Sequence, residues 1–474
     1  MNALFRILPI AAALAVGCST VRSAKEAQRE LAPKGEADPA VSAKIDLRGR
    51  TLADLVSFAL TNRPSVVSAR LEVEDARLSL RQLAADAPLV SDSPWSAPTL
   101  SLSGSYSESS PGTTIGRAGW STDPGSPSAA LSLDLLIWDF GRYDAKAAAQ
   151  KERVLAAERS LADEGFSVFG EVAASYFNLL EKQALLEVAF TNEFQYADHL
   201  RHAEALLDEG EANRLDVLKA RLDFSRARQT TVSASNAVAT AGATLMCALG
   251  VEASRGTCDE VLGELSDGIG CVRRAFPRTT DDVGAAFALA RTNAPSVCVA
   301  RARLRAASHD VDAAVADLMP NVSASVELRW TDPLWFWNWG VSAAQSLFQG
   351  FRKTTAVDRA VVSLRRAAAA VDAAEQTLSV QLETAIATRD DSAKALESAR
   401  ASIRSAKENL DTVREQYALG EANRIELSDA IAADSEARGD AIRAFYAGQR
   451  AEAELAAVIG RYPTYREEIL KETK

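Results

Sequence analysis

Two long intervals without proline constrain the fold of this chain more than any other feature of its sequence. No proline lies between Pro127 and Pro277, or between Pro333 and Pro463. Because proline interrupts helix interiors, very long helices can form within these two intervals. The sequence therefore predicts a mainly helical molecule whose longest helices occupy two separate parts of the chain.

Three short motifs recur in the same order in the two halves of the chain, which indicates an internal duplication. The recurring motifs are Asn-x-Pro-Ser at 62–65 and 293–296, Phe-Gly-Arg at 140–142 with the related Gln-Gly-Phe-Arg at 349–352, and Gly-Glu-Ala-Asn-Arg at 210–214 and 420–424. A repeat of this length is much longer than a solenoid unit. We therefore expect two copies of one domain-sized unit.

Each copy is predicted to contain two short helices, two strands and two long helices, in that order. The expected short helices are 51–62, 64–86, 281–293 and 295–318, and the expected strands are 98–108, 129–139, 320–330 and 338–348. The expected long helices are 142–208, 213–249, 352–418 and 423–460. At about 1.5 Å per residue, the longest would measure roughly 100 Å, which few soluble globular cores require.

This order of elements divides the chain into six expected segments. They are a signal peptide 1–17, a lipid-anchored linker 18–50, a first structural repeat 51–250 with a β-hairpin at 98–139 and a long helical hairpin at 142–249, an inter-repeat linker 251–280, a second structural repeat 281–460 with a β-hairpin at 320–348 and a long helical hairpin at 352–460, and a tail 461–474.

The long helices carry apolar residues at the spacing of a coiled-coil seam. Leu396, Ile403, Leu410 and Tyr417 follow one another at intervals of seven, and so do Val172, Leu179 and Leu186. Further apolar residues lie three positions from several of these, which gives the alternation of three and four that knobs-into-holes packing requires. A simple dimeric coiled coil would explain these seams but not the predicted strands.

The N-terminal residues are typical of an export signal that ends at a modifiable cysteine. A short apolar stretch follows Arg6 and closes in Leu-Ala-Val-Gly-Cys at 14–18, where small residues precede the cysteine as in the bacterial lipobox. We expect Cys18 to be acylated, with Ser19 favouring delivery to the outer membrane; an ordinary signal with an incidental cysteine is the alternative. No later apolar run has the length of a membrane helix, so any membrane span is expected to be β-structure.

The predicted hairpins alternate apolar and polar residues, and every tryptophan of the chain lies in or beside them. Val322, Val326 and Trp330 lie on one face of a predicted strand that places Asn321 and Glu327 on the other. The tryptophans are Trp95, Trp120, Trp138, Trp330, Trp335, Trp337 and Trp339. Such alternation and interfacial tryptophans are typical of a transmembrane barrel, and a soluble β-sandwich edge packed on helices is the alternative.

Four strands cannot close a barrel, so several chains must share one barrel, and three chains would supply twelve strands.

Charge and composition narrow the function further. The net charge of -11 argues against a nucleic-acid partner, because phosphate binding requires a basic surface.

Cys258 and Cys271 bracket a loop-like segment and form a possible disulfide, with free buried thiols as the alternative. His199 and His202 share a helix face and could bind a metal, but a solvated pair is the preferred interpretation. No phosphate loop or catalytic constellation is present, so we expect neither an enzyme nor a cofactor.

Taken together, these features resemble the TolC-like outer-membrane efflux family. The resemblance rests on the duplicated order of helices and strands, on Trp-Asp-Phe-Gly-Arg at 138–142, on Tyr-x-x-Gly at 417–420 and on Asp-Val-Leu at 216–218. It covers nearly the whole chain after the lipobox-like segment. It implies a fold that is mainly α with a membrane β-barrel part, in which a homotrimer forms a twelve-stranded barrel on a long periplasmic α-barrel.

The resemblance also implies roles for residues at the two helical turns. Gly210, Glu211, Ala212 and Asn213 in the first turn, and Gly420, Glu421, Ala422 and Asn423 in the second, match the periplasmic tip where adaptor hairpins dock. Glu426 and Asp429 match acidic residues that form a ring at the aperture, and a solvated helix face is the alternative. Asp216 and Tyr417 match one pair of residues whose contact closes the tip.

The expected function is therefore an outer-membrane exit duct of a tripartite efflux or type I secretion system. Its expected partners are two further copies of the chain, a periplasmic adaptor protein, an inner-membrane transporter and outer-membrane lipid. A lipid anchor would hold it in the outer membrane with the helices in the periplasm. A periplasmic coiled-coil scaffold lipoprotein is the alternative function, but it leaves the two-faced hairpins and their tryptophans without a purpose.

Overall fold

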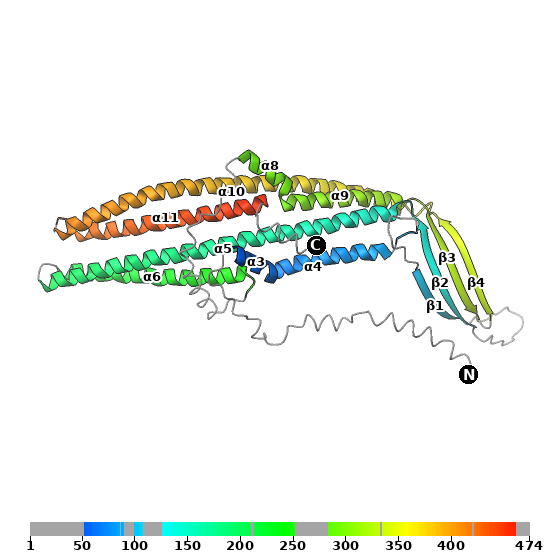
Figure 1. The fold of residues 1–474 in the computed structure, drawn as a ribbon, viewed down its shortest axis with the longest axis horizontal. Coiled ribbons are helices and arrows are strands. Elements are labelled where there is room, and N and C mark those ends of the chain that lie inside the picture. The colour runs from blue at the N-terminus through cyan, green and yellow to red at the C-terminus, as the bar shows by residue number, and fades with distance from the viewer. Residues whose placement is uncertain are drawn as a thin grey trace, which may run out of the picture.

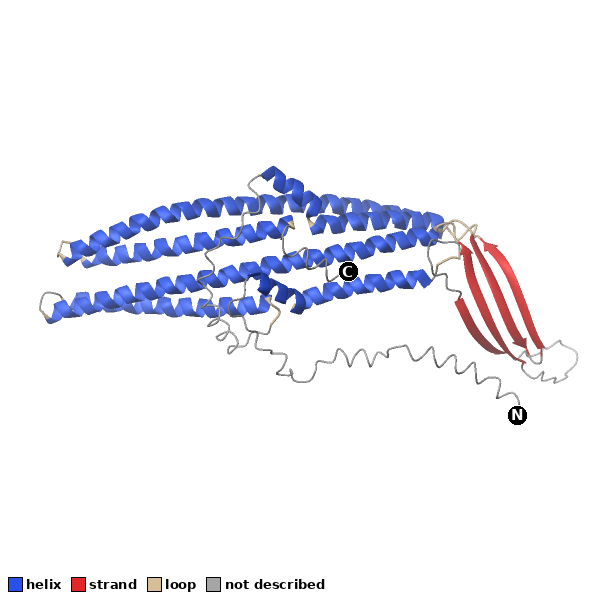
Figure 2. Ribbon diagram, in the orientation of Figure 1, coloured by secondary structure: helices blue, strands red, loops and turns tan. Residues whose placement is uncertain are grey.

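A computed structural model of the chain shows a long body of helices with one small sheet at its end (Figures 1 and 2). It describes residues 52–85, 87–89, 99–107, 126–209, 213–251, 283–331, 334–419 and 421–460. None of the helices in these ranges is long and apolar enough to cross a lipid bilayer.

Both halves contain the expected series of helices and strands. The first half contains α3 (Leu52–Asn62), α4 (Pro64–Ala85), β1 (Thr99–Ser107), β2 (Ser126–Trp138), α5 (Arg142–Asp208) and α6 (Arg214–Ala248). The second half contains α8 (Val283–Asn293), α9 (Pro295–Ala316), β3 (Asn321–Thr331), β4 (Leu334–Ala344), α10 (Arg352–Ala418) and α11 (Arg424–Ile459). The predicted fold class is thus confirmed for the single chain.

Strand β4 differs from the prediction, because it begins and ends four residues earlier than the expected 338–348. It pairs with β3 from Ala344 opposite Asn321 to Leu334 opposite Thr331. Pairing ends there because the partner strand β3 begins at Asn321, directly after Pro320, which has no backbone N–H to donate to the ladder. The aromatic residues that follow Leu334 belong to the ladder, since such side chains pack well on a pleated surface.

The long helices lie side by side in one layer (Figure 1). Away from the sheet the order across the layer is α6, α5, α11 and α10, and toward the sheet it is α4, α5, α9 and α10. Helix α5 therefore lies inside the layer throughout its length. Helix α10 forms one edge, and α4 together with α6 forms the other.

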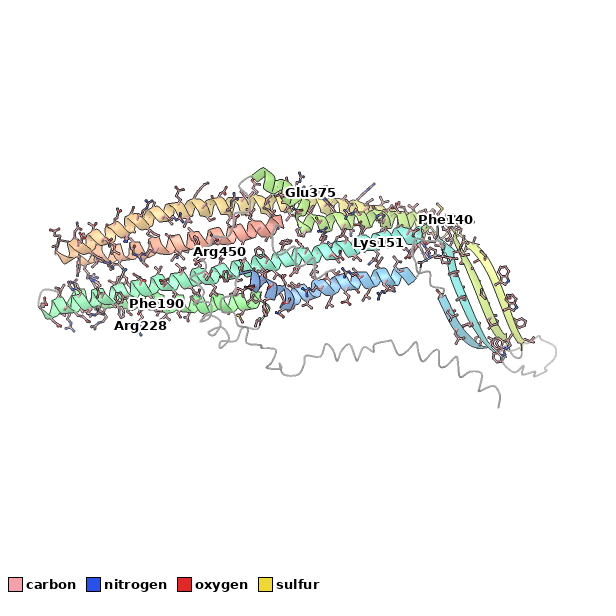
Figure 3. The ribbon with its side chains drawn as sticks, viewed as in Figure 1. Phe140, Lys151, Phe190, Arg228, Glu375 and Arg450 are labelled. Carbon is pink, nitrogen blue, oxygen red and sulfur yellow. The ribbon has the colours of Figure 1, made fainter. Side chains whose placement is uncertain are left out.

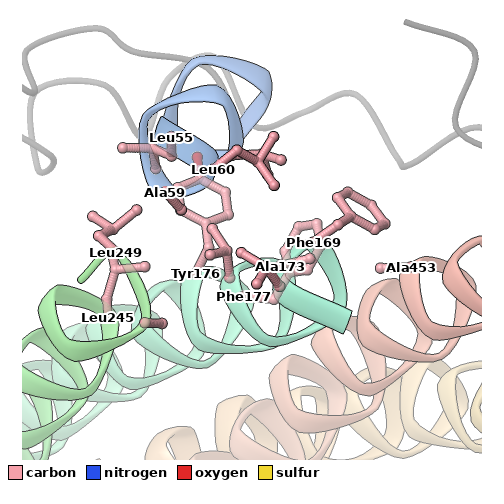
Figure 4. Packing of buried hydrophobic residues seen from close by; sticks show 14 of the residues in the cluster. Leu55, Ala59, Leu60, Phe169, Ala173, Tyr176, Phe177, Leu245, Leu249 and Ala453 are labelled. Carbon is pink, nitrogen blue, oxygen red and sulfur yellow. The ribbon is translucent and has the colours of Figure 1, made fainter. Parts of the chain in front are cut away.

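The main hydrophobic core lies near the middle of the body, where α3, α5, α6 and α11 meet (Figure 4). Phe169 and Val172 of α5 are fully buried there, and Tyr176 and Leu179 continue the same face. Burial of each such side chain stabilises the fold by about 1.5–3 kcal/mol. The predicted seam of the first half is thus confirmed as a core seam. Leu410 of the second predicted seam is buried in a smaller cluster near the helical turns.

The repeated Asn-x-Pro-Ser motif marks the place where a long helix ends against a pair of short ones. Gly250 follows α6 with φ 78°, and a Cβ atom there would lie 3.0 Å from the Cα atom of Arg63. Gly460 follows α11 with φ 67°, and a Cβ atom there would lie 3.3 Å from the carbonyl oxygen of Asn293. The positive φ and the close approach both favour glycine, so the same closure is built twice.

Candidate functional site: the two-faced sheet and the helical tips

The four strands form one antiparallel sheet in which apolar and polar side chains alternate in register. The sheet order is β1-β2-β3-β4. One row across all four strands is Leu102, Leu131, Leu328 and Trp337, and an adjacent row is Ser101, Ser132, Glu327 and Asn338. Because neighbouring rows point to opposite faces, the sheet has one apolar and one polar face. The predicted alternation is therefore a property of the whole sheet and not of one strand.

Polar side chains on the polar face hydrogen-bond to one another across the strands. The hydroxyl pairs are Ser101 with Ser132 at 2.6 Å, Ser105 with Ser128 at 2.9 Å and Ser323 with Ser342 at 3.1 Å. Near the hairpin end, Arg329 donates to the carboxylate of Glu327 at 3.1 Å. This face suits contact with water, whereas the apolar face requires a cover of lipid or protein.

All five described tryptophans of the expected aromatic belt belong to the apolar face. Trp330 and Trp335 lie opposite each other at the hairpin end, and Trp337 and Trp339 follow along β4 with about 70% of their surface exposed. Trp138 joins this face because a β-bulge after Leu136 shifts the register of β2 by one residue. Tryptophan rings thus lie toward both ends of the sheet, as at the two surfaces of a membrane.

Further exposed aromatic residues, which were not among the predicted site residues, lie at the junction between sheet and helices. Phe140 stacks on Trp138 with ring centroids 5.2 Å apart, and it has a positive φ of 56°. In the second half Phe351, at the position that corresponds to Gly141, has φ 63° and contacts Phe348 edge to face at 5.5 Å. Figure 3 shows Phe140 where the sheet meets the helices. The repeated Phe-Gly-Arg motif could have indicated this aromatic junction.

The outer strands of the sheet continue the outer helices of the layer. Strands β1 and β4 each pair on one side only within the described part of the chain. Helix α4 precedes β1, and α10 follows β4. The two free edges of the sheet therefore lie on the same sides as the two free edges of the helical layer.

At the other end of the body, an asparagine caps the helix that follows each turn. The Asn213 side chain accepts a hydrogen bond from the backbone N–H of Leu215 at 3.3 Å. Asn423 forms a complete capping box, in which the Glu426 carboxylate accepts from the backbone N–H of Asn423 at 3.0 Å. Of the second expected docking turn, Glu421 and Ala422 both donate backbone N–H groups to the carbonyl oxygen of Gln416.

Charged and aromatic residues from all four long helices meet just behind these turns, in what we call the tip cluster. It consists of Tyr196, His199, Asp216, Asp223, Tyr417 and Arg424. The guanidinium of Arg424, with only 13% of its side chain exposed, lies 3.3 Å from the carboxylate of Asp223 and 3.8 Å from that of Asp216. This ion pair links the first helical hairpin to the second.

The expected contact between Asp216 and Tyr417 takes a different form within one chain. Among the described residues, Tyr417 makes no hydrogen bond to Asp216, whose carboxylate faces Arg424 instead. A full positive charge attracts a carboxylate more strongly than a neutral phenol does. Burial raises the pKa of Tyr417, and the charge of Asp216 raises it further while Arg424 opposes it.

An apolar patch supports the tip cluster from the side of the body. Tyr196 packs with Leu427 and Ile431, and its hydroxyl donates to the carbonyl oxygen of Ser428 at 3.3 Å. Burial raises the pKa of Tyr196, and the nearby charges of Asp223 and Asp429 add to this rise. Asp429 itself is exposed to solvent.

His199 is buried, so the predicted solvated histidine pair is wrong for this residue. Its ring packs edge to face on that of Tyr417 with centroids 5.7 Å apart, whereas His202 is exposed. Periodicity alone could not separate the two, because both lie on the helix face toward Tyr417. The described residues hold no group of three or more side chains that could bind a metal ion.

Several predicted site residues lie outside the described residues. They are Cys18, Cys258, Cys271, Gly210, Glu211, Ala212, Gly420, Trp95 and Trp120. The acylation site, the possible disulfide and most of the first docking turn therefore stay predictions. Cys247 and Cys298, which the structure describes, are free thiols.

Comparisons with known proteins agree with this arrangement. A family model described as outer membrane efflux protein matches residues 55–251 and 287–461. The Campylobacter jejuni CmeC outer membrane channel is similar in structure, with TM-score 0.73, 17% identity and 89% of each chain covered. The outer membrane protein VceC of Vibrio cholerae has TM-score 0.71 and 16% identity, with 86% of this chain and 96% of VceC covered.

A third similar structure is that of CusC, solved in a study of folding and transmembrane channel formation. Its TM-score is 0.72 at 21% identity, with 87% of this chain and 92% of CusC covered. At these identities the similarity concerns the fold alone. A search of curated proteins found no match.

Proposed function

Because the chain belongs to the outer membrane efflux protein family, we propose that it is the outer-membrane exit duct of a tripartite efflux or type I secretion system. The observation that carries this proposal is the four-stranded sheet, which has one wholly apolar face and two free edges. Open strand edges are not tolerated in lipid, so the sheet must be completed by other strands.

Three copies of the chain would complete the sheet as a closed barrel of twelve strands. The two free edges, β1 and β4, are different surfaces, so β4 of one copy would pair with β1 of the next in a head-to-tail ring. The apolar face would then meet lipid between two rings of aromatic residues, and the serine-rich face would line the pore. Small transmembrane barrels require this complete hydrogen bonding between strands.

The free edges of the helical layer would close in the same ring. Exposed apolar residues lie at heptad-like spacing on the edge helices α4 and α6, where no described helix of the same chain covers them. They are Val67, Leu71 and Leu78 on α4, and Leu215, Leu218, Leu222 and Val232 on α6. The opposite edge helix, α10, exposes Val362 and Val380. Contact between these edges in neighbouring copies would form an α-barrel below the β-barrel.

The helical turns would then form the periplasmic opening of the duct. We assign the turns at 210–213 and 420–423 to docking of a periplasmic adaptor protein, which connects the duct to an inner-membrane transporter. Glu426 and Asp429 of three copies would place six carboxylates at the aperture. The Arg424 link to Asp223 and Asp216 supports this assignment, because it holds the two hairpins of each copy together at that level.

The aperture proposal is tested with substitutions that preserve the helix cap. Since Glu426 belongs to a capping box, Glu426→Gln can still accept the hydrogen bond from the backbone N–H of Asn423 while its charge is removed, and Asp429→Asn accompanies it. A ring of acidic residues confers preference for cations, so the double variant should lose much of the cation selectivity measured in lipid bilayers. Unchanged selectivity and unchanged block by divalent cations would place both carboxylates outside the aperture.

The docking proposal predicts that the turns matter for export more than for assembly. Replacing Gly210 or Gly420 by valine should disturb the turn, because a β-branched residue does not tolerate positive φ. Export in cells should fall while the oligomer still forms. Normal export by both variants would show that the turns are not docking surfaces.

The lipid anchor is tested separately from the duct. Mass spectrometry of the mature N-terminus should find an acylated Cys18, and the same digest without reduction tests the Cys258–Cys271 disulfide. An unmodified N-terminus at another residue would exclude the lipid anchor and leave the duct proposal intact.

The alternative function is a periplasmic coiled-coil scaffold lipoprotein. A scaffold would not need an apolar sheet face with exposed tryptophans, and lipid provides the cover that this face requires. The mature chain should therefore require detergent for extraction, and its reconstitution into bilayers should yield ion-conducting pores. Extraction as a monomer in detergent-free buffer, with no conductance, would support the scaffold.

A further inference from the structure

His199 is a buried titratable residue that has no role in the proposed duct function. Its side chain is 6% exposed, and its Nε2 atom is buried without a hydrogen-bond partner among the described residues. A buried polar atom without a partner costs free energy, so its retention inside the tip cluster requires an explanation.

The charged and titratable groups around His199 come from all four long helices. Helix α6 contributes Asp223, α10 contributes Tyr417 and α11 contributes Arg424. On α5 itself the neighbours are His202 and Asp198, and Asp198 is paired with Arg201 at 3.1 Å. Of these groups, Arg424 and Asp223 are the two that form the ion pair between the hairpins.

Protonation would change the role of His199 in this cluster. The neutral imidazole carries no charge and therefore does not repel the nearby guanidinium of Arg424. The imidazolium would repel the guanidinium of Arg424 and attract the carboxylate of Asp223, so it would weaken the ion pair between these two groups.

We propose that His199 is a proton-operated release for the link between the two helical hairpins at the tip of the duct. With His199 neutral, Arg424 holds Asp223 and the hairpins stay together. With His199 protonated, the Arg424–Asp223 contact is weakened and the first turns of α11 separate from α6. As a means of opening the aperture, this release rests on the proposed duct function.

The direction of the pH dependence follows from the surroundings of the imidazole. Burial lowers the pKa of His199, and the charge of Arg424 lowers it further, against the smaller opposing effect of Asp223. The group is therefore neutral at neutral pH, and the folded tip loses stability as the pH falls below about 6.5, the ordinary pKa of histidine. Each unit by which the folded pKa lies below the ordinary value corresponds to about a tenfold change in the opening equilibrium.

Hydrogen exchange of the first turns of α11 measures the release in the full-length protein. The protection factor of peptides that cover 424–431, corrected for the intrinsic effect of pH, should fall severalfold between pH 7.5 and pH 5 in the wild-type protein. His199→Phe keeps an aromatic ring beside Tyr417 but cannot be protonated, so its protection should be independent of pH. His199→Gln serves as a second variant in case the larger ring disturbs folding. His202→Gln, on the exposed neighbour, is the matched control and should behave as the wild type.

The outcomes separate this inference from the duct itself. Equal pH dependence in the wild type and in both His199 variants would overturn the release. Conductance in lipid bilayers, recorded at the same two pH values, should rise at acid pH in the wild type more than in His199→Phe. If neither the wild type nor any variant conducts, but the hydrogen exchange of 424–431 still depends on His199, the proposed proton-operated release is supported and the proposed duct function is contradicted.

Discussion

Helices α5 and α10 are corresponding helices of the two repeats, yet they have different surroundings. Each contains 67 residues, and they begin 210 residues apart, at Arg142 and Arg352. One face is apolar and buried in both, as the corresponding pairs Val168 and Leu378, Val172 and Leu382, and Tyr176 and Ile386 show. The adjacent face of the two helices differs in burial. Phe169, Ala173 and Leu180 of α5 are buried there. The residues at the corresponding positions of α10, Ser379, Glu383 and Asp390, are exposed.

The position of each helix in the layer explains this difference. Helix α5 lies inside the layer and has neighbours on both sides, whereas α10 lies at the edge and packs mainly on α9 and α11. A duplicated sequence therefore retains the face that packs within each repeat. The second face has diverged because only α5 is covered by the other half of the chain.

The largest expected effect comes from removing a side chain on the face that only α5 buries. Phe169→Ala would leave a cavity in the main core and should lower the free energy of unfolding by about 3–5 kcal/mol. The corresponding substitution in α10, Ser379→Ala, should change it by less than about 0.5 kcal/mol. Circular dichroism during denaturation in detergent measures both. Equal losses would mean that the two helices are equally covered.

The tip offers a second comparison, between arginines that start the two helices after the turns. Arg424 of α11 is mostly covered and forms an ion pair with Asp223, whereas Arg214 of α6 is exposed. Arg424→Ala should cost about 1–2 kcal/mol, because both carboxylates that lose their partner are partly exposed to water. Arg214→Ala should cost less than about 0.5 kcal/mol. A larger loss for Arg214 in the same unfolding experiment would remove the ion pair as the link between the hairpins.

The asparagine N-caps of α6 and α11 differ in how much each stabilises its helix, and this difference is expected to be smaller. Asn213→Ala and Asn423→Ala should each destabilise the following helix by about 1 kcal/mol. The loss should be greater for Asn423, because its side chain accepts from the backbone N–H groups of both Ile425 and Glu426, whereas the Asn213 side chain, among the described residues, accepts only from that of Leu215. Hydrogen exchange in the first turn of α6 and of α11 measures the two effects separately. Equal exchange in the two variants would show that the additional bonds of the Asn423 side chain contribute nothing.

The smallest expected effect is confined to acid pH and concerns an ion pair between the two halves. Burial alone would raise the pKa of Glu181, but hydrogen bonds from Lys182 and Arg450 lower it below its ordinary value. Its stabilising effect is therefore present above the ordinary pKa of a glutamate and is lost as the pH falls through the lowered value. Stability of Glu181→Gln should fall less than that of the wild type between pH 6 and pH 3, and Asp391→Asn, at the corresponding exposed position, should not differ from the wild type.

The sequence predicts the elements that periodicity specifies and misses contacts that depend on three dimensions. The proline-free intervals and the duplicated motifs indicate the long helices closely, and alternation indicates the two-faced sheet. The end of β4 is misplaced because its pairing stops where the partner strand β3 begins, at Asn321 after Pro320, and the alternation within β4 does not reveal this limit.

At the tip, the sequence indicates the turns but not the groups that join the hairpins. Arg424 and Asp223 lie about two hundred residues apart, and no local pattern pairs them. Burial of His199 likewise depends on Tyr417 from the other repeat. The Asn213 and Asn423 caps, by contrast, follow from the sequence, because the same Gly-Glu-Ala-Asn-Arg motif precedes both helices.

The closure of three copies into one ring is tested most directly by joining β1 to β4 of neighbouring copies. Leu102→Cys on β1 and Val341→Cys on β4, combined in a chain whose other cysteines except Cys18 are replaced, would be treated in membranes with a short bifunctional maleimide. A head-to-tail ring of three predicts a covalent product that stops at three chains, together with single-chain and two-chain intermediates, and either single variant should give no product larger than two chains. A ladder that continues beyond three chains, or no cross-linking between chains, would contradict the shared barrel.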